Sequence, residues 1–151
     1  MKKQIFLFAL LALFATFVAA QDKEPEYEYG RPSELKGLTK LFIDTHADTQ
    51  NYDRLVKEIK ATSALKDLKI VETAEEAEII ILYKGDIERV LTPPTASLAL
   101  IQGQALVFVV KGLNKPRLVM RYGNVQESAW EQKPSTKFIK EFAKTYKTAN
   151  K

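Results

Sequence analysis

The sequence feature that most constrains the fold is the segment Glu78 to Lys84, EIIILYK, which holds five consecutive apolar residues. These residues are rich in β-branched types, and the run is too short for a stable helix. Continuous apolar runs of this length are typical of strands that are buried on both faces. The segment therefore predicts a central strand of a sheet.

Two further segments have the spacing of amphipathic helices. The first carries apolar residues at i, i+3, i+4 and i+7, namely Tyr52, Leu55, Val56 and Ile59. Thr49 or Asn51 is expected to supply the capping oxygen for its first turn. The second helix is predicted from about Ser135 to Lys147, and one side of it carries Phe138, Ile139, Phe142, Ala143 and Tyr146.

Shorter patterns predict the remaining elements. Residues 41–43 and 68–71 read as strands, and Thr73 with Glu76 forms a capping-box pattern that opens one short turn. Residues 105–110 and 118–122 flank a turn and predict a β-hairpin. Between Gly85 and Gln102 the pattern is less regular, because Pro93 and Pro94 do not fit a central strand, and 97–101 is expected to pair at an edge.

Together these elements predict an α+β fold. We expect a single mixed sheet of about five strands with two main helices covering one face. The first two strands are joined by a helix, so they should lie parallel with a right-handed crossover. Residues 38–148 are long enough for one domain with a single core, and 149–151 are expected to form a tail.

The N-terminal residues predict export. Residues 1–20 begin with Lys2 and Lys3, continue as an apolar run, and end with Val18 and Ala20 at the −3 and −1 positions of a signal-peptidase site. A cleaved signal peptide is expected, the alternative being an uncleaved anchor. After cleavage the formal charge falls from +4 to +2, no transmembrane span is expected, and the protein should be soluble in the periplasm or secreted. Residues 21–37 are polar and predict a flexible arm, the alternative being that Tyr27 and Tyr29 dock on the domain.

Several chemistries are excluded by residue content. The chain has no cysteine, so disulfides, cysteine zinc sites and the lipid-anchored cysteine of bacterial lipoproteins are absent. No two of its six glycines are closer than seven residues, so no dinucleotide-binding or P-loop motif is present. His46 is the only histidine, and no serine lies in a nucleophile motif. We expect no cofactor, and the small net charge and lack of a motif argue against nucleic-acid binding.

One polar cluster suggests chemistry. Asp44, His46 and Asp48 form a D-x-H-x-D pattern directly after a predicted strand, and these three side chains with water could hold a divalent metal. The alternative is that the two aspartates make side-chain turns, Thr49 caps the helix and His46 is a solvated loop residue. The first interpretation would give a small metal-dependent hydrolase.

Two features suggest binding instead. Lys137, Lys140, Lys144 and Lys147 form a stripe nearly opposite the apolar side of the last predicted helix. Such a stripe is either the solvated side of the helix or a contact for an acidic partner or an anionic envelope surface. Trp130 precedes this helix and either stacks on a ligand, if exposed, or fixes the helix to the sheet, if buried.

The segments GLTKLFID, LVKEIKAT, LKIVETAEEAEIIILY and GQALVFVVKGLNKPRLVMRY resemble the plan of small bacterial envelope domains. These include the amino-terminal domain of the Tol-system propeller protein, the curli-secretion lipoprotein and related uncharacterised secreted proteins. The resemblance covers most of residues 36–148 and carries no catalytic residues. It implies an α+β domain with a role in protein contacts or envelope assembly.

These observations favour an exported, non-enzymatic binding or accessory protein of the bacterial cell envelope. We expect a protein partner to bind at a sheet edge or on the lysine-lined helix, because unpaired strand edges offer hydrogen-bonding groups to a second chain. Pro93 and Pro94 are expected to block one edge and leave the other available.

Overall fold

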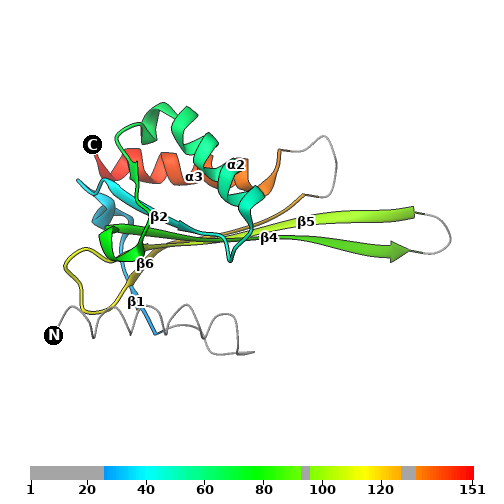
Figure 1. The fold of residues 1–151 in the computed structure, drawn as a ribbon, viewed down its shortest axis with the longest axis horizontal. Helices are drawn as coiled ribbons and strands as arrows, with labels where there is room; N and C mark the ends of the chain where they lie inside the picture. The colour runs from blue at the N-terminus through cyan, green and yellow to red at the C-terminus, as the bar shows by residue number, and fades with distance from the viewer. Residues whose placement is uncertain (1–25, 93–95, 127–131) are drawn as a thin grey trace.

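The computed structural model describes residues 26–92, 96–126 and 132–151, which form one mixed sheet with two main helices (Figure 1). Within these residues the sheet has six strands in the order β1-β6-β5-β4-β2-β3. The strands are β1 Glu28–Tyr29, β2 Lys40–Asp44, β3 Lys69–Ile70, β4 Ile79–Thr92, β5 Ala96–Val109 and β6 Arg117–Gln126. The helices are α2 Thr49–Ala61 and α3 Pro134–Ala149. The predicted α+β class, with one mixed sheet, is confirmed.

The apolar run that predicts a central strand lies in β4, between β5 and β2. Ile79, Ile81 and Tyr83 belong to the core under the helices, whereas Ile80 and Leu82 belong to a second apolar cluster. Because alternate residues of a strand lie on opposite faces, the run is apolar at every position. β2 pairs in parallel with β3, and β5 pairs antiparallel with β6, as the sequence predicts. β4 lies between them, parallel to β2 and antiparallel to β5.

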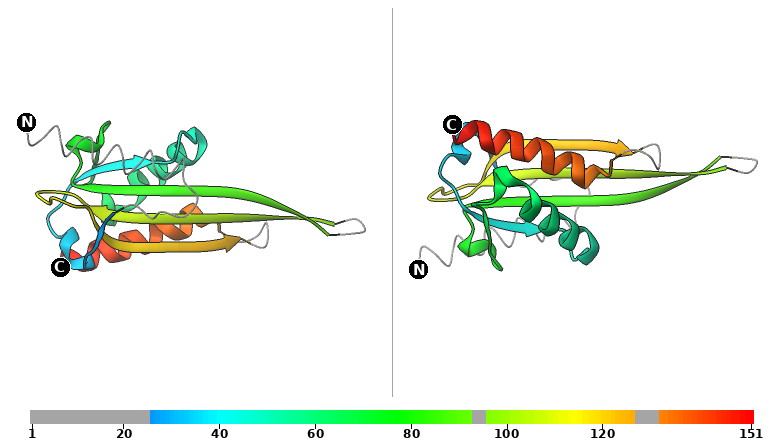
Figure 2. Two further views of the ribbon diagram at one scale, coloured as in Figure 1. Left: turned by 90° about the horizontal axis from the view of Figure 1, so that it is seen from below. Right: turned by 90° about the horizontal axis from the view of Figure 1, so that it is seen from above.

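Both helices pack on the same face of the sheet, as two further views show (Figure 2). α3 buries the predicted apolar stripe, and α2 buries Leu55 and Ile59. Phe138 is fully buried, with its ring centroid 5.9 Å from Tyr83 and 5.6 Å from Tyr122. The α3 aromatic residues therefore form the centre of the main core.

The segment that the sequence predicts to be a flexible arm is folded from residue 28 onwards. β1 pairs in parallel with β6, and the 3-10 helix η1 (Pro32–Leu35) follows it. Leu35 is fully buried in the main core. The prediction for 26–37 is therefore wrong, because one leucine and a short strand in a polar segment are enough to dock it; residues 21–25 lie outside the described part.

The two ends of the described chain are joined by hydrogen bonds. The Tyr146 hydroxyl donates to the Leu38 carbonyl oxygen at 2.7 Å, and the Gly37 N–H donates to Asn150 Oδ1 at 2.8 Å. Asn150 thus belongs to the folded unit and not to a free tail. Contacts of this kind fix the N-terminal segment against the end of α3.

Glu78 connects β2 to the start of β4. Its Oε2 accepts from the backbone N–H groups of Thr39 at 2.7 Å and Lys40 at 3.2 Å, and its Oε1 lies 2.6 Å from Lys111 Nζ. Partial burial raises the pKa of the Glu78 carboxyl, but these hydrogen bonds and the lysine charge outweigh burial and hold the pKa at about 2. The carboxylate is therefore ionised throughout the neutral range.

Candidate functional site

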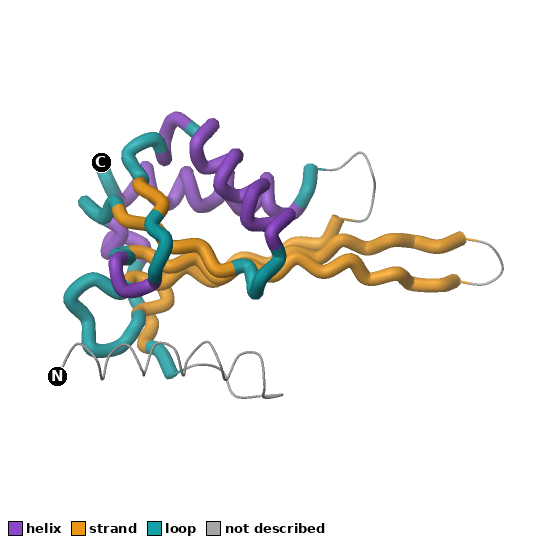
Figure 3. The backbone as a smooth tube through the Cα atoms, viewed as in Figure 1, coloured by secondary structure: helices purple, strands orange, loops and turns teal. Residues whose placement is uncertain are grey.

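The most distinctive feature of the fold is a long hairpin that leaves the sheet. β2 pairs with β4 only as far as Asp44 opposite Leu82, and β6 pairs with β5 only as far as Gln126 opposite Ile101. Beyond these pairs β4 and β5 continue together to Thr92 and Ala96. Residues 86–92 and 96–100, which we call the hairpin arm, project past the helices as a two-stranded ribbon (Figure 3).

This arm replaces the irregular stretch that the sequence predicts between Gly85 and Gln102. Residues 97–101 do pair, with β4, and 97–100 have no described strand on their other side, so they lie at an edge as the sequence predicts. Asp86, Glu88 and Arg89 interrupt the apolar pattern of β4, which is why the sequence gives no sign of a continuous strand. Pro93 and Pro94 lie between the described strand ends, outside the described residues, so their expected blocking role stays a prediction.

The sequence of the arm includes apolar residues in both strands. In the backbone register Val90 is paired with Leu98, and Ile87 with Ile101. An isolated two-stranded ribbon is at best marginally stable in water. Its outer edges also carry backbone groups that can pair with another strand. The arm therefore combines apolar positions with open edges.

A pair of glycines marks the base of the arm. Gly85 and Gly103 are directly opposite each other in the ladder. A Cβ at Gly103 would lie 2.4 Å from Pro134 Cβ, and a Cβ at Gly85 would lie 2.7 Å from Asn51 Nδ2. Only glycine allows the starts of both helices to approach the strands this closely.

The sequence predicts that one sheet edge is available, whereas two strands of the described sheet have open backbone edges. The outermost strands β1 and β3 have two residues each, and β1 pairs with β6 only at Arg117 and Leu118. In the described part of the chain, residues 119–126 of β6 have no strand on their outer side. β4 is open in the same way beyond Leu82.

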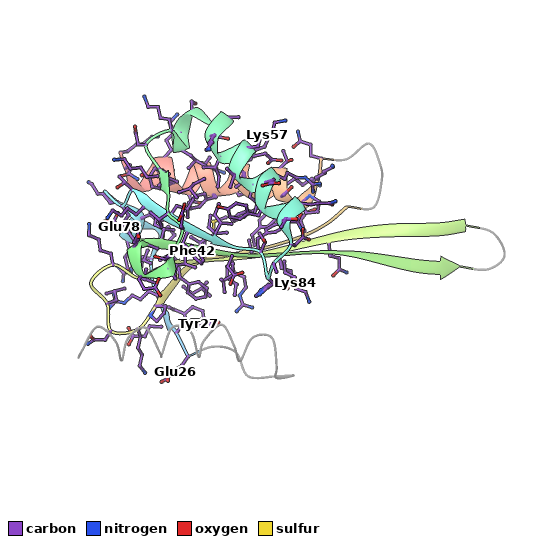
Figure 4. All side chains as sticks on the ribbon, viewed as in Figure 1. Glu26, Tyr27, Phe42, Lys57, Glu78 and Lys84 are labelled. Atoms are coloured by element: carbon purple, nitrogen blue, oxygen red, sulfur yellow. The ribbon has the colours of Figure 1, made fainter. Side chains whose placement is uncertain are left out.

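The face of the sheet away from α2 and α3 carries the second apolar cluster. Its buried members are Ala77, Ile80, Leu82, Phe108, Val110 and Leu118. Tyr27 packs against it, with its ring 5.6 Å from Phe108, and Figure 4 shows Tyr27 and Phe42 on this side. Tyr27, directly before β1, is thus held against this face.

The D-x-H-x-D segment forms the connection from β2 to α2. Asp44 Oδ1 accepts from the His46 N–H at 2.7 Å, and His46 and Ala47 have φ values of 53° and 66°. Asp48 Oδ1 accepts from the Asn51 N–H at 2.9 Å and Oδ2 from Asn51 Nδ2 at 2.8 Å. Asp48, and not Thr49 or Asn51, is therefore the N-cap of α2.

This geometry does not bring the predicted metal ligands together. Among the described residues, no group of three histidine, cysteine or acidic side chains could hold a metal ion. Asp44 and Asp48 make local turns and caps, as the alternative interpretation predicts. The left-handed backbone at His46 and Ala47 breaks the extended geometry on which a shared ligand face depends.

The lysine stripe lies along α3. Lys140, Lys144 and Lys147 are exposed, and Lys137 is partly buried, with Nζ 3.4 Å from Asn124 Oδ1. Lys140 Nζ donates to Gln132 Oε1 at 2.8 Å. Three of the four lysine side chains are therefore exposed and can contact either solvent or a partner.

The remaining sequence predictions fall outside the described residues. Trp130 and residues 1–20 lie there, so the role of the tryptophan and the signal peptide stay predictions. No helix in the described part of the chain is long and apolar enough to cross a membrane.

Comparison with known proteins gives little further information. No protein-family model matches the chain, and no curated protein matches it. The fold is similar to that of the hypothetical protein CT253 from Chlamydia trachomatis, with a TM-score of 0.42 and 7% sequence identity. The match covers 73% of this chain and 94% of that chain. Similarity at this level carries no inference about function, and the resemblance to Tol-system and curli domains stays a prediction.

Proposed function

We propose that this protein is an exported, non-enzymatic accessory or binding protein of the bacterial cell envelope that contacts a protein partner through its hairpin arm. The arm is the observation that carries the proposal, because it extends two strands of the sheet beyond every flanking strand that the structure describes. The export component depends on the sequence of residues 1–20.

The arm suits recognition by strand addition. A partner strand that pairs with its open edge gains main-chain hydrogen bonds, and the apolar residues of the arm supply specificity. A partner that packs on the arm would also bury its apolar residues, which a two-stranded ribbon cannot bury by itself. The basic helix is retained as a second contact surface to be tested beside the arm.

The alternative of a metal-dependent hydrolase has no support from the geometry. Asp44 and Asp48 accept backbone hydrogen bonds at the start of α2, and the described residues contain no three-residue metal cluster.

Site-specific photocrosslinking in cells tests the proposal. A photoreactive phenylalanine analogue is placed at Val90 or Leu98 in the arm, with Lys57 on α2 as the matched control position (Figure 4). We expect a discrete heavier adduct from the arm positions and none from position 57. Adducts of equal yield at all three positions, or none at either arm position, would overturn the proposal.

A charge-reversal variant separates the two surfaces. Lys140→Glu combined with Lys144→Glu reverses two exposed charges of α3 and leaves the arm unchanged. We expect the arm adducts to persist in this variant. Loss of the adducts would place the principal contact on the last helix.

A further inference from the structure

The two main helices carry most of the net positive charge of the described chain. α2 and α3 together hold seven basic and three acidic residues, a formal charge of +4 over 29 residues. The other 89 described residues hold 13 basic and 12 acidic residues and are therefore close to neutral. The excess charge is thus a property of the helices and not of the sheet.

The exposed part of this charge lies on the sides of the helices that face away from the sheet. Lys140 is two residues from Phe138 and from Phe142, which are both buried, so it lies about 160° around α3 from each of them. Lys57 has the same relation to the two buried residues of α2. Because both helices pack on the same face of the sheet, these two sides belong to one outer surface (Figure 2).

Four exposed lysines define this surface, which we call the basic helix surface. They are Lys57, Lys140, Lys144 and Lys147. Thr136 Oγ1 of α3 donates to Glu58 Oε1 of α2 at 2.7 Å, and this bond holds the two helices next to each other. The surface therefore extends over both helices and is wider than the lysine stripe of α3.

Nearby carboxylates do not balance the charges of the basic helix surface. In the part of the chain that the structure describes, none of the four lysines has a carboxylate oxygen within 4.0 Å of its Nζ. Lys140 Nζ donates to Gln132 Oε1 at 2.8 Å, but this amide is neutral. Three of the lysines are spaced four and three residues apart on α3, where like charges repel each other. An anionic partner would relieve this repulsion.

The chemistry of the surface favours acidic phospholipids over an acidic protein. Lysine ammonium groups are point charges on flexible stems and lack the planar geometry with which arginine recognises a fixed carboxylate. Neither the cavity at the base of the arm nor the one beside the β5–β6 turn is lined by these four lysines. Among the described residues no large apolar side chain is exposed on α2 or α3, whereas protein interfaces usually have an apolar core. A fluid layer of anionic headgroups needs neither a pocket nor an apolar core.

We propose that the basic helix surface binds the headgroups of acidic phospholipids in a bilayer. The helices then face the membrane, and the sheet lies on the side of the helices away from it (Figure 1). The arm continues past the helices and is not part of this contact, so it stays available to a protein partner. The lipid contact does not depend on the arm contact, so either proposal can fail alone.

Cosedimentation of the purified protein with lipid vesicles tests the proposal. One set of vesicles contains about 30% phosphatidylglycerol in phosphatidylcholine. The reference set is phosphatidylcholine alone, which measures any binding by apolar residues. We expect the partition coefficient to be at least about tenfold higher for the anionic vesicles. Raising the ionic strength from about 0.05 M to about 0.5 M should remove most of this difference, because salt screens exposed charges.

Two double variants localise the contact. Lys140→Gln combined with Lys144→Gln removes two charges from the basic helix surface and should lower the partition coefficient on anionic vesicles at least about fivefold. Lys69→Gln combined with Lys84→Gln is the matched control, because it removes the same charge from exposed positions on the other face of the sheet (Figure 4). We expect the control to change the partition coefficient less than about twofold.

The outcomes separate the lipid contact from its alternatives. An anionic-vesicle preference that falls in the Lys140 and Lys144 variant and persists in the control would support the proposal. Equal partitioning to both vesicle types, or an equal loss in both double variants, would overturn it. Salt-sensitive binding to poly-glutamate without a preference for anionic vesicles would also overturn it, and would assign the surface to an acidic protein.

Discussion

Strands β4 and β5 pass through two different environments, the body of the sheet and the hairpin arm. In the body, β4 and β5 are flanked by other strands, and one face is covered by two helices. In the hairpin arm the same strands pair only with each other among the described residues. Most of the free energy of unfolding should therefore come from the body. The arm contributes little to it, but extends the sheet and exposes backbone hydrogen-bonding groups.

The largest expected effect is in the body. Phe138→Ala removes a fully buried ring that contacts Tyr83, Tyr122 and Phe142. We expect a loss of about 3–5 kcal/mol in the free energy of unfolding. Urea unfolding followed by circular dichroism measures this, with Phe138→Leu as the milder control. A loss below about 1 kcal/mol would mean that the core does not centre on α3.

The boundary between the two environments is tested at Gly103. Gly103→Ala places a Cβ against the Pro134 ring, so the start of α3 must shift. We expect destabilisation of about 2–3 kcal/mol, which the same unfolding experiment measures. Gly123→Ala is the control, because nothing lies within 4 Å of a Cβ at that position. Equal effects of the two substitutions would contradict the close approach at the base of the arm.

Glu78→Gln tests the polar connection between β2 and β4. The folded pKa of about 2 lies below the ordinary value of 4.5, so the carboxylate contributes stability above pH 4.5. That contribution is lost as the pH falls from 4.5 towards 2. We expect the native protein to exceed the variant by on the order of 2 kcal/mol at pH 7, and the difference to vanish near pH 2.

The control for this pH dependence is Glu76→Gln, which neutralises an exposed carboxyl nearby. Its free energy of unfolding should follow that of the native protein across the pH range. A difference between native protein and Glu78→Gln that stays constant from pH 7 to pH 2 would show that the Glu78 charge is not responsible.

The start of α2 gives a smaller effect. Asp48→Ala removes the acceptor of the Asn51 N–H and should cost about 1 kcal/mol, whereas Asp48→Asn keeps a capping oxygen and should cost less. Thermal unfolding measures both. Treatment with EDTA should leave all three midpoints unchanged; a fall in the native midpoint alone would revive the metal site.

The smallest expected effect on stability is in the arm. Replacing residues 88–100 with Asn-Gly joins the paired residues Ile87 and Ile101 by a two-residue turn. The free energy of unfolding should change by less than about 0.5 kcal/mol. A loss of stability above about 1 kcal/mol would show that the arm supports the body.

The elements that the sequence predicts correctly are those with a strong local pattern. The β4 apolar run and the α3 stripe depend on residues that are buried where they are expected. The position of β1 and the burial of Leu35 could not be predicted, because β1 pairs with β6 almost ninety residues away and Leu35 joins a core that includes residues of α3. The arm was missed because residues outside the body need no alternation of apolar and polar types.

The candidate sites also divide into features that depend on local sequence and features that depend on distant residues. Local hydrogen bonds at Asp44 and Asp48 follow from turn chemistry and were predictable as the alternative to metal binding. By contrast, Arg54, Tyr83 and Ser135 line one small cavity but come from three elements, so no spacing in the sequence connects them.

The joining of the N-terminal segment to the end of α3 determines when the chain can fold. The Gly37 to Asn150 hydrogen bond spans 113 residues, and the Tyr146 to Leu38 bond spans 108. A nascent chain lacks these partners until Tyr146 and Asn150 have been synthesised. The N-terminal segment should therefore dock late, and contacts of such long sequence separation form slowly.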